Sequence, residues 1–375
     1  MALRVLHLID SGGLYGAERM LLALADEQAR QGVVPLILSA GEHGVQEKPL
    51  EAEARRLGVP VTVWRMRPGL NLHQAWKILR WAREQGFQLL HSHGYKFNVL
   101  AGIWPRAIRR LPLVCTLHGY VRAPRWTRSA LYESVDRALL RRVDRVVIVN
   151  QRMRADLPPS LAASAHCTFI ANGIPSETPP VIPLPDDLAA WQRSHRVNLI
   201  AVGRLSPEKG FDRLVRIIGR HRHALSGIGL LIVGDGPQRS ELERAIAEKD
   251  LSDMVRLGGY REDAAALLPH FDALVMPSLT EGLPITVLEA LRARLPIFAN
   301  AVGGLPAVLK AVPSARLLSV TDESAWAELL LDIAGTGVEA GDTAIGAAHF
   351  AAHYSASRMA AGYSCVYADL LDASV

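Results

Sequence analysis

The sequence predicts a two-domain α/β protein in which each domain is a doubly wound parallel sheet. Three observations lead to this prediction. The chain has 375 residues, about two domains' worth, and 49% of them are hydrophobic, which is ample for two cores. Apolar strand-like runs alternate with helical patterns in both halves. A proline-rich break separates the halves.

The first element is a short apolar strand, residues 4–10, which leads into a glycine-rich loop, residues 11–16, and then a helix. As a dinucleotide-binding fingerprint the loop is one glycine short, because Ser11 holds the first position of G-x-G-x-x-G. No acidic residue ends the next apolar run, residues 33–38, so an NAD site is disfavoured. A tight turn without a ligand is the alternative for Gly12.

Histidines follow two further apolar strands of the first half. His118 ends the run at 113–120, and His91 and His93 end a strand at 88–90. A lone histidine after an apolar strand is more often structural than catalytic. The rings of His-x-His point the same way from a strand, but no third ligand is visible in the sequence. We therefore expect them to line a pocket or contact an acceptor.

Prolines mark the boundary between the halves. Five of them fall within residues 175–185, and so many cannot sit in the interior of a sheet or helix. Residues 173–195 are therefore predicted to form the linker. Residues 1–172 would then make up the first domain and residues 196–352 the second.

Two cations follow the first strand of the second half. Residues 197–203 have the pattern of a buried strand, and Arg204 and Lys209 project from its carboxyl end. Ligands of open parallel sheets bind at that edge. The planar fork of an arginine and the point charge of a lysine can neutralise a diphosphate without a metal ion. Solvated loop cations are the structural alternative.

Two carboxylates, Glu281 and Glu289, stand on either side of a predicted helix start. Pro284 is a natural first residue of a helix, so Glu281 should lie in the preceding loop and Glu289 in the second turn. Between them, Gly282 and the first free backbone amides of the helix can receive an anion. A phosphate flanked by two hydroxyl-binding carboxylates is what a nucleotide sugar needs.

The second half contains four short motifs, one after another along the chain. They are V-G-R-L-S-P-E-K-G at 202–210, I-V-G-D-G-P at 232–237, the Glu-x7-Glu pair, and A-V-G-G-L-P at 301–306. Together they resemble the retaining glycosyltransferases of glycosyltransferase family 4, which have the GT-B fold; the first half matches more loosely. The resemblance implies two Rossmann-like domains that face each other across a cleft. It also implies that a last helix, about 353–375, packs on the first domain.

The resemblance assigns roles to matching residues. Arg204 and Lys209 would hold the donor diphosphate, and Glu281 would contact the donor sugar. Glu289 would contact the ribose, and His118 would lie close to the donor sugar. The glycine-rich loop would approach the donor phosphate and the acceptor. The remaining donor-binding positions are Gly13, Gly16, Gly203, Gly282, Leu283 and Pro284.

The chain departs from the family pattern at two places. The family usually has a glycine after the Glu-x7-Glu helix, whereas residues 293–296 here read Ala-Arg-Leu-Pro. We therefore expect this helix to end without the left-handed residue that glycine provides. Ala307 stands where the family commonly places a glutamate, which removes a candidate polar contact near the acceptor.

Charge divides unevenly along the chain. Residues 1–180 hold 24 basic and 14 acidic residues, and the remainder holds 18 basic and 23 acidic residues. The densest stretch of arginines, which we call the basic patch, also contains Trp126 and Tyr132. It suggests docking on anionic lipid, which would contribute ~1 kcal/mol per basic residue. A solvated helix face is the alternative, and no nucleic-acid recognition module is visible. The arginines of the basic patch are Arg122, Arg125, Arg128, Arg137, Arg141, Arg142 and Arg145.

Cysteine usage and hydropathy suggest a cytoplasmic protein, soluble or peripheral on the membrane. The three cysteines, Cys115, Cys167 and Cys365, are too widely spaced for a disulfide framework or a zinc cluster. The amino terminus lacks the apolar length of a signal peptide, and no run approaches the ~20 residues of a spanning helix.

These features predict a retaining hexosyltransferase that needs no metal cofactor. Its donor would be a nucleotide-diphosphate sugar, most commonly a UDP-sugar, and its acceptor a glycan or lipid-linked glycan in cell-envelope polysaccharide synthesis. A GT-B nucleotide-sugar epimerase or hydrolase is one alternative, and it would show no acceptor dependence. A non-catalytic sugar-nucleotide binding protein is the other, and the intact Arg204, Lys209 and two glutamates argue against it.

Overall fold

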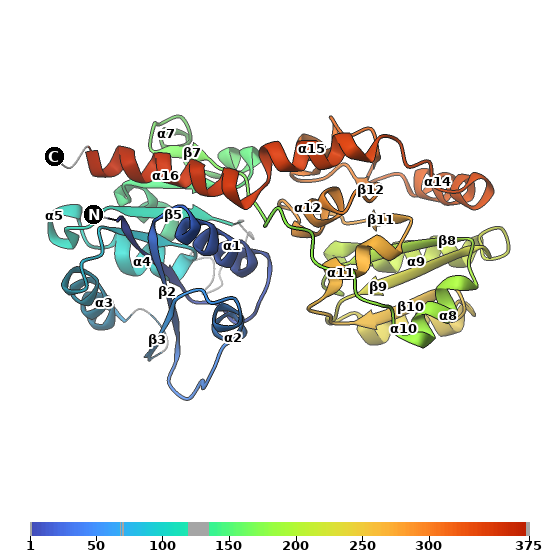
Figure 1. Ribbon diagram of the computed structural model, residues 1–375, viewed down its shortest axis with the longest axis horizontal. Coiled ribbons are helices and arrows are strands. Elements are labelled where there is room, and N and C mark those ends of the chain that lie inside the picture. The colour runs from blue at the N-terminus through green and yellow to red at the C-terminus, as the bar shows by residue number, and fades with distance from the viewer. Residues whose placement is uncertain (1, 68, 70, 119–134, 373–375) are drawn as a thin grey trace. The chain divides into compact units, whose positions relative to one another are not determined.

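The computed structural model describes residues 2–67, 69, 71–118 and 135–372. The chain divides into two units, Met1–Pro175 with Ser355–Val375, and Ser176–Tyr354. Each unit contains one parallel sheet with helices packed on it (Figure 1). The two Rossmann-like sheets expected from the sequence are thus confirmed.

Within the described residues, the first unit holds a seven-stranded parallel sheet in the order β3-β2-β1-β4-β5-β6-β7. The order reverses between β1 and β4, which pair directly. The strands are β1 Arg4–Ile9, β2 Val34–Glu42, β3 Val61–Met66, β4 Leu89–Ser92, β5 Leu113–Leu117, β6 Arg145–Ile148 and β7 Cys167–Phe169. The helices described in this unit are α1 Gly16–Arg30, α2 Pro49–Arg56, α3 Leu72–Glu84, α4 Tyr95–Gly102, α5 Arg106–Arg109, α7 Pro159–Ala162 and α16 Ala356–Asp372, with 3-10 turns η1 Leu140–Arg142 and η2 Gln151–Asp156.

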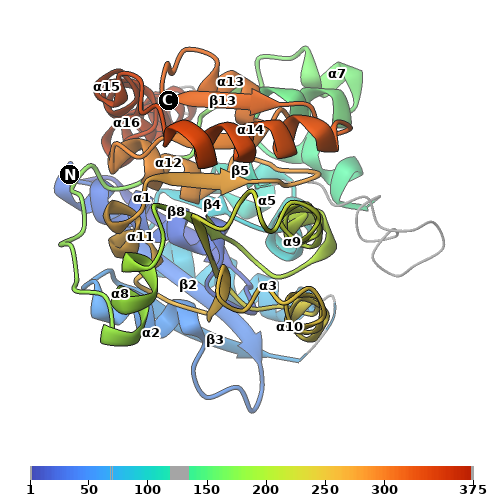
Figure 2. The same ribbon diagram turned by 90° about the vertical axis from the view of Figure 1, so that its right-hand side faces the viewer.

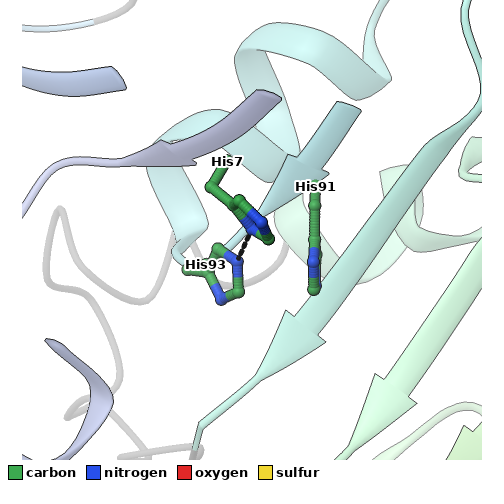
Figure 3. A group of neighbouring side chains, drawn as sticks. All are labelled: His7, His91 and His93. Carbon is green, nitrogen blue, oxygen red and sulfur yellow. Dashed lines mark hydrogen bonds between the residues drawn. The ribbon is translucent and has the colours of Figure 1, made fainter. Parts of the chain in front are cut away.

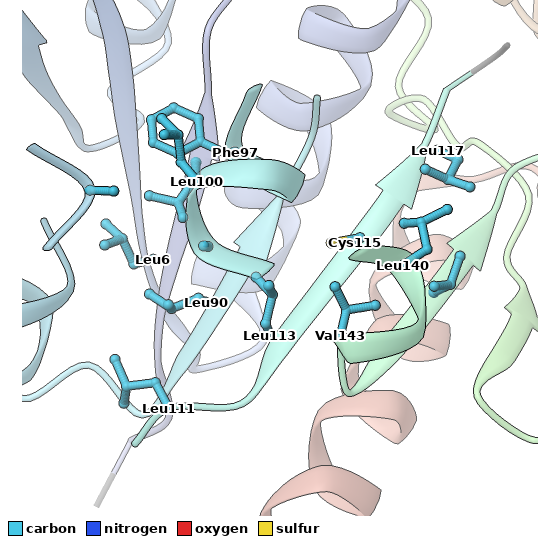
Figure 4. Close-up of a cluster of buried hydrophobic side chains, with 14 of the residues drawn as sticks. Leu6, Leu90, Phe97, Leu100, Leu111, Leu113, Cys115, Leu117, Leu140 and Val143 are labelled. Atoms are coloured by element: carbon cyan, nitrogen blue, oxygen red, sulfur yellow. The ribbon is translucent and has the colours of Figure 1, made fainter. Parts of the chain in front are cut away.

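Alternation along the strands divides the first core into two layers. Leu6 and Leu90 face one side of the sheet, where they pack with Phe97 of α4 (Figure 4). Val5 faces the other side and packs with Met20 of α1 and with residues of α16. A sheet buried on both faces explains the near-continuous apolar runs of its strands.

The last helix, α16, belongs to the first unit although it follows the whole of the second. It packs beside α1 (Figure 1). Its side chains Met359, Tyr363 and Tyr367 are buried in the core. Gly173 lies against its start, where a β-carbon would come within 2.4 Å of the carbonyl oxygen of Ser355. Only glycine allows this approach without a shift of the backbone.

The second unit contains, within the described residues, a six-stranded parallel sheet in the order β10-β9-β8-β11-β12-β13. Helices α9, α10 and α14 pack on one face, with α9 and α10 side by side (Figure 2). The strands are β8 Val197–Val202, β9 Ile228–Val233, β10 Val255–Gly259, β11 Ala273–Met276, β12 Ile297–Asn300 and β13 Ala315–Leu318. The helices are α8 Asp186–Arg193, α9 Phe211–Arg220, α10 Arg239–Glu248, α11 Ala264–Leu267, α12 Ile285–Arg292, α13 Leu305–Leu309, α14 Glu323–Thr336 and α15 Thr343–His353, with 3-10 turns η3 Pro207–Lys209 and η4 Leu268–His270.

Part of the linker expected at 173–195 is helical. Residues 186–193 form helix α8, which follows Pro185 directly. Asp186 and Asp187 in its first turn favour a helix start, because carboxylates stabilise the positive end of the helix dipole. The prolines therefore keep only the residues before Asp186 out of regular structure.

A polar cluster interrupts the core of the first unit on the side of α1 and α16. His7 of β1 pairs directly with His91 of β4, and His93 follows two residues later (Figure 3). The three side chains are 0%, 0% and 4% exposed, respectively. Burial lowers the pKa of His7 to about 4 and lowers the pKa values of His91 and His93 well below the ordinary value. All three rings are therefore neutral at pH 7.

Acid should destabilise this unit. The pKa of His7 is about 4 in the folded protein against 6.5 for an ordinary histidine, so between these values the unfolded chain binds the extra proton. The stability that His7 contributes is present above pH 6.5 and is lost as the pH falls towards 4, by ~3 kcal/mol for a shift of this size. Thermal melts at several pH values should show a falling Tm over this window, with a shallower fall for His7→Gln. An equal fall in both proteins would contradict the assignment.

Candidate active site

The loops that carry the predicted donor site meet at the carboxyl edge of the second sheet. Strand order reverses between β8 and β11, and the loops at 203–210 and 277–284 follow these two strands. The amide of Leu279 donates to the carbonyl of Glu208 at 2.8 Å, which ties one loop to the other. Such a reversal is the place where open parallel sheets bind ligands.

Lys209 and Glu281 form an ion pair at this edge. The Lys209 Nζ lies 2.6 Å from Glu281 Oε1, and the Ser278 hydroxyl donates to the same oxygen at 2.6 Å. The two side chains are 20% and 8% exposed, respectively, so water screens them less than it screens a surface pair. The structure therefore brings together two residues that the sequence placed 72 positions apart.

Arg204 stands in the same loop but extends into solvent. It directly follows Gly203 and is exposed. The nearby Glu208 has a lowered pKa, first because it accepts a hydrogen bond from Ser206 and then because of the charges of Arg204 and Lys209. The loop thus presents one exposed guanidinium and one held ammonium on the same edge.

Glycines allow the loops of this edge to approach each other closely. A β-carbon on Gly303, whose φ is +55°, would lie 1.7 Å from the carbonyl oxygen of Glu281. One on Gly234 would lie 1.9 Å from the carbonyl oxygen of Gly203. A β-carbon on Gly210, whose φ is +67°, would lie 2.4 Å from the carbonyl oxygen of Pro277. Side chains cannot fit at these positions, which explains why three of the sequence motifs are rich in glycine.

Helix α12 starts one residue later than expected, because Pro284 is its cap and Ile285 its first residue. Glu281 lies in the preceding loop, and Glu289, half-buried, is the fifth residue of the helix, in its second turn, as predicted. Burial lowers the pKa of Arg292, whereas the charge of Glu289 acts in the opposite direction. The remaining predicted donor positions here are exposed Gly282 and half-buried Leu283 and Pro284.

The end of α12 corrects one expectation. Arg294 itself adopts the left-handed conformation, with φ +57°, directly after the cap residue Ala293. The helix therefore ends with the geometry that a glycine would give, and the expectation of a different closure was wrong. A non-glycine residue pays a steric cost for this conformation.

The glycine-rich loop of the first unit is held by Glu18 of α1. The Ser11 hydroxyl donates to its carboxylate, and the Tyr15 amide donates to Glu18 Oε2 at 2.8 Å. Gly13 lies under the Tyr15 ring, where a β-carbon would come within 2.4 Å of a ring carbon. Gly16 is the first residue of α1, one residue earlier than the predicted helix.

Gly12 behaves differently from Gly13. A β-carbon there would meet nothing within 4 Å, and its φ is not in the left-handed range. Neither packing nor backbone conformation therefore requires a glycine at this position.

A charged cluster that the sequence did not reveal lies at the corresponding edge of the first sheet. Asp10, directly after β1, is 2.7 Å from Lys48 Nζ and 2.5 Å from Lys96 Nζ. Burial alone would raise the pKa of Asp10, but hydrogen bonds from both lysines lower it. The position of Asp10 at a strand end could be predicted from the sequence. The two lysines come from distant segments, so the sequence did not connect them with Asp10.

His118 lies where the sequence placed it, directly after β5. Burial lowers its pKa to about 4. His91 and His93 were expected to line a pocket or contact an acceptor, and this was wrong, because both are buried in hydrogen bonds inside the unit. His7 is the third histidine of this cluster, and the sequence analysis did not single it out. Its pairing with His91 depends on the strand order, which periodicity does not specify.

The basic patch lies partly outside the described residues, which exclude Arg122, Arg125, Arg128, Trp126 and Tyr132. Its described arginines divide equally between exposed Arg141 and Arg142 and half-buried Arg137 and Arg145. Arg145 lies 3.6 Å from the carboxylate of Asp369. In the described part of the chain, none of the helices combines the length and apolar character needed to cross a membrane. All three cysteines are free.

Comparison with known proteins covers both halves of the chain. The model described as Glycosyltransferase Family 4 matches residues 15–178, and the one described as Glycosyl transferases group 1 matches residues 196–335. The 2-deoxystreptamine glucosyltransferase of Streptomyces kanamyceticus is 28% identical over 79% of this chain and 83% of its own. The 2-deoxystreptamine N-acetyl-D-glucosaminyltransferase of Streptomyces fradiae is 26% identical over 83% and 80%, respectively.

Solved structures share the fold over nearly the full length. Anabaena Alr3699/HepE in complex with UDP superposes with a TM-score of 0.80 at 19% identity, covering 98% of this chain and 100% of that one. Sucrose-phosphate synthase from Thermosynechococcus elongatus gives 0.76 at 18% identity, covering 99% and 100%, respectively. With the family matches in both halves and the two Rossmann-like units, this shows that the chain belongs to the family 4 glycosyltransferases and has their GT-B fold.

Proposed function

We propose that this glycosyltransferase is a retaining enzyme that moves a hexose from a UDP-sugar to a glycan or lipid-linked acceptor in cell-envelope polysaccharide synthesis. The observation that carries the proposal is the pair of Lys209 and Glu281 at the reversal of the second sheet. Exposed Arg204 and the start of α12 lie on the loops that follow the same two strands. A cation, a carboxylate and the start of a helix suit the leaving diphosphate and the sugar hydroxyls of such a donor.

The charge that meets the leaving diphosphate would come from the protein. Arg204 and Lys209 both lie in the loop that follows β8, so one short segment supplies two positive charges. Lys209 is already held in position by Glu281, so little reorganisation is needed when negative charge develops. Arg204 would supply the planar fork that binds two phosphate oxygens.

The proposed chemistry is displacement on one face of the sugar ring. The glycosidic bond to the diphosphate breaks as the bond to the acceptor oxygen forms, and the departing diphosphate takes the proton of the acceptor hydroxyl. The proposed displacement forms no covalent bond between the sugar and a side chain. His118 would contact the donor sugar as a neutral ring.

The nucleotide and acceptor are proposed from two further observations. The Anabaena protein has been solved with UDP and with UDP-glucose, which favours UDP. The relatives are named for an amine acceptor, 2-deoxystreptamine, or for phosphatidylinositol. The first 180 residues carry 24 basic against 14 acidic groups, and such a surface attracts a phosphate-bearing acceptor and repels an amine.

A donor screen tests the proposal. The purified chain should bind UDP-sugars more tightly than GDP- or ADP-sugars in calorimetry, and should transfer sugar only when a phosphate-linked glycan acceptor is added. NMR of the product should show the anomeric configuration of the donor. Consumption of donor without an acceptor would favour the epimerase or hydrolase alternative. Binding without turnover would favour the non-catalytic one.

Removal of either cation should slow the reaction strongly while sparing the fold. Arg204→Ala or Lys209→Ala should lower kcat by about 10²- to 10³-fold, because each charge stabilises the leaving group in the transition state. Wild-type turnover should persist in excess EDTA. Initial rates and thermal melts measure both effects. Near-normal kcat in both variants, or loss of wild-type activity in EDTA, would refute this assignment.

The two glutamates should differ in kinetic effect. Glu289→Ala should mainly raise the KM for the donor, because a ribose contact is equally strong in the ground and transition states. Glu281→Ala should mainly lower kcat, because it removes the partner of Lys209 and the contact with the reacting sugar. Glu281→Gln keeps a hydrogen bond and serves as the milder comparison. Reversed effects would exchange the two roles.

Anionic liposomes should bind the protein through the basic patch. Flotation with anionic but not neutral vesicles is expected at low salt, and high salt should release the protein, because exposed charges are screened. Arg141→Glu with Arg142→Glu should weaken binding, since both side chains are exposed. Arg244→Glu, an exposed residue of the second unit, is the control. Equal recovery with both kinds of vesicle would eliminate membrane docking.

A further inference from the structure

The buried polar cluster of the first unit forms a continuous row of hydrogen bonds that ends at His118. Gln28 Oε1 lies 2.8 Å from His7 Nε2, and His7 Nδ1 lies 3.0 Å from His93 Nε2. His93 Nδ1 lies 3.4 Å from His118 Nε2, at the long end of hydrogen bonding, with the two rings stacked 5.7 Å apart. The last atom of the row, His118 Nδ1, is buried and has no partner among the described residues.

A second row starts from the side-chain nitrogen of the same glutamine. Gln28 Nε2 donates to the Tyr367 hydroxyl of α16 at 3.2 Å. The hydroxyl lies 2.7 Å from His91 Nδ1, and His91 Nε2 lies 2.7 Å from the Thr116 hydroxyl. The side-chain amide of Gln28 therefore has its nitrogen towards α16 and its oxygen towards His7.

The three histidines do not have the bonding of a metal site, although their ring nitrogens lie within 4.8 Å of one another. Each of the six nitrogens of His7, His91 and His93 already has a hydrogen-bond partner. A metal ion bound by one nitrogen of each ring would have to displace at least two of these bonds. None of the partners is a carboxylate, so nothing in the cluster would offset the charge of a divalent ion in a site without water.

The row has one direction, because a neutral imidazole has one N–H donor and one acceptor nitrogen. Since the Gln28 oxygen only accepts, His7 carries its proton on Nε2 and accepts at Nδ1 from His93. His93 in turn accepts at Nδ1 from the Nε2 proton of His118. Burial lowers the pKa values of all three rings, so none carries a second proton at neutral pH. His118 is left with a bare lone pair on Nδ1.

We propose that Gln28, His7 and His93 are positioning residues that hold His118 in the tautomer with its proton on Nε2, so that Nδ1 accepts a hydrogen bond from a hydroxyl of the sugar substrate. The use of that acceptor rests on the proposed function, whereas the tautomer does not. A sugar hydroxyl must point its proton at this acceptor to bond with it. An acceptor held in one position therefore selects one rotamer of that hydroxyl in the bound sugar. A reversed row would present an N–H donor at the same place.

The test measures the tautomer and the rate separately. In full-length protein labelled with nitrogen-15 histidine, two-bond proton–nitrogen correlations distinguish protonated from bare ring nitrogens, and His118→Asn identifies the signals of His118. Wild type should show the proton on Nε2 alone. Gln28→Met removes the acceptor of His7, so a buried N–H lacks a partner at one end of the row or the other whichever its direction, and His118 should become a mixture of tautomers. The kcat should fall, by up to about tenfold, the value of one neutral hydrogen bond.

Two further variants make the result specific. His93→Leu breaks the last link and should leave His118 as a mixture of tautomers, even if Gln28→Met proves unstable. Ser92→Ala is the matched control, because Ser92 stands between His91 and His93 in the sequence while its buried hydroxyl donates to Asn98 Oδ1 at 2.7 Å, outside the row. It should leave both the tautomer and kcat unchanged.

Separate results would overturn the two hypotheses. A proton on Nδ1 in wild type, an unchanged tautomer in both Gln28→Met and His93→Leu, or stoichiometric zinc bound by wild type would refute the positioning role. A wild-type protein that keeps the expected tautomer but transfers no sugar would instead refute the proposed function.

Discussion

The close approach of backbone to backbone at the carboxyl edge of the second sheet is the constraint on which the site depends. Gly303 packs against the carbonyl of Glu281, and Gly234 packs against that of Gly203. The amide of Gly304 also donates to the carbonyl of Gly282 at 2.8 Å. These contacts fix the backbone that carries the functional side chains. Lys209 and Glu281 can therefore pair without being held by long side-chain networks.

The two units use the same principle with different chemistry. In each, the strand order reverses between two neighbouring strands, and charged side chains gather in the loops that follow. The second unit has the pair of Lys209 and Glu281, and the first has Asp10 between Lys48 and Lys96. Sheets of the same topology thus offer a polarised edge in both units, and the residues on the loops decide what each edge can bind.

Local patterns predicted much of the fold and the place in it of the candidate site residues. Apolar runs located β5 and β8, and Pro284 marked the start of α12 to within one residue. The residues that periodicity could not connect were those joined by strand order and by long-range packing. His7 meets His91 only because β1 and β4 are neighbours, and Lys96 meets Asp10 for the same reason.

The last helix has a consequence for how the chain is made. Tyr363 and Tyr367 complete the core of the first unit and bond within its polar cluster, yet they follow the entire second unit. On the ribosome, residues 1–175 emerge well before their last helix exists, whereas residues 176–354 are complete when synthesised. The second unit can therefore fold first, against the usual order, whereas the first unit waits for α16 with part of one apolar sheet face uncovered. If the enzyme depends on a chaperone, residues 1–175 would be the part that needs it, because α16 is synthesised so much later.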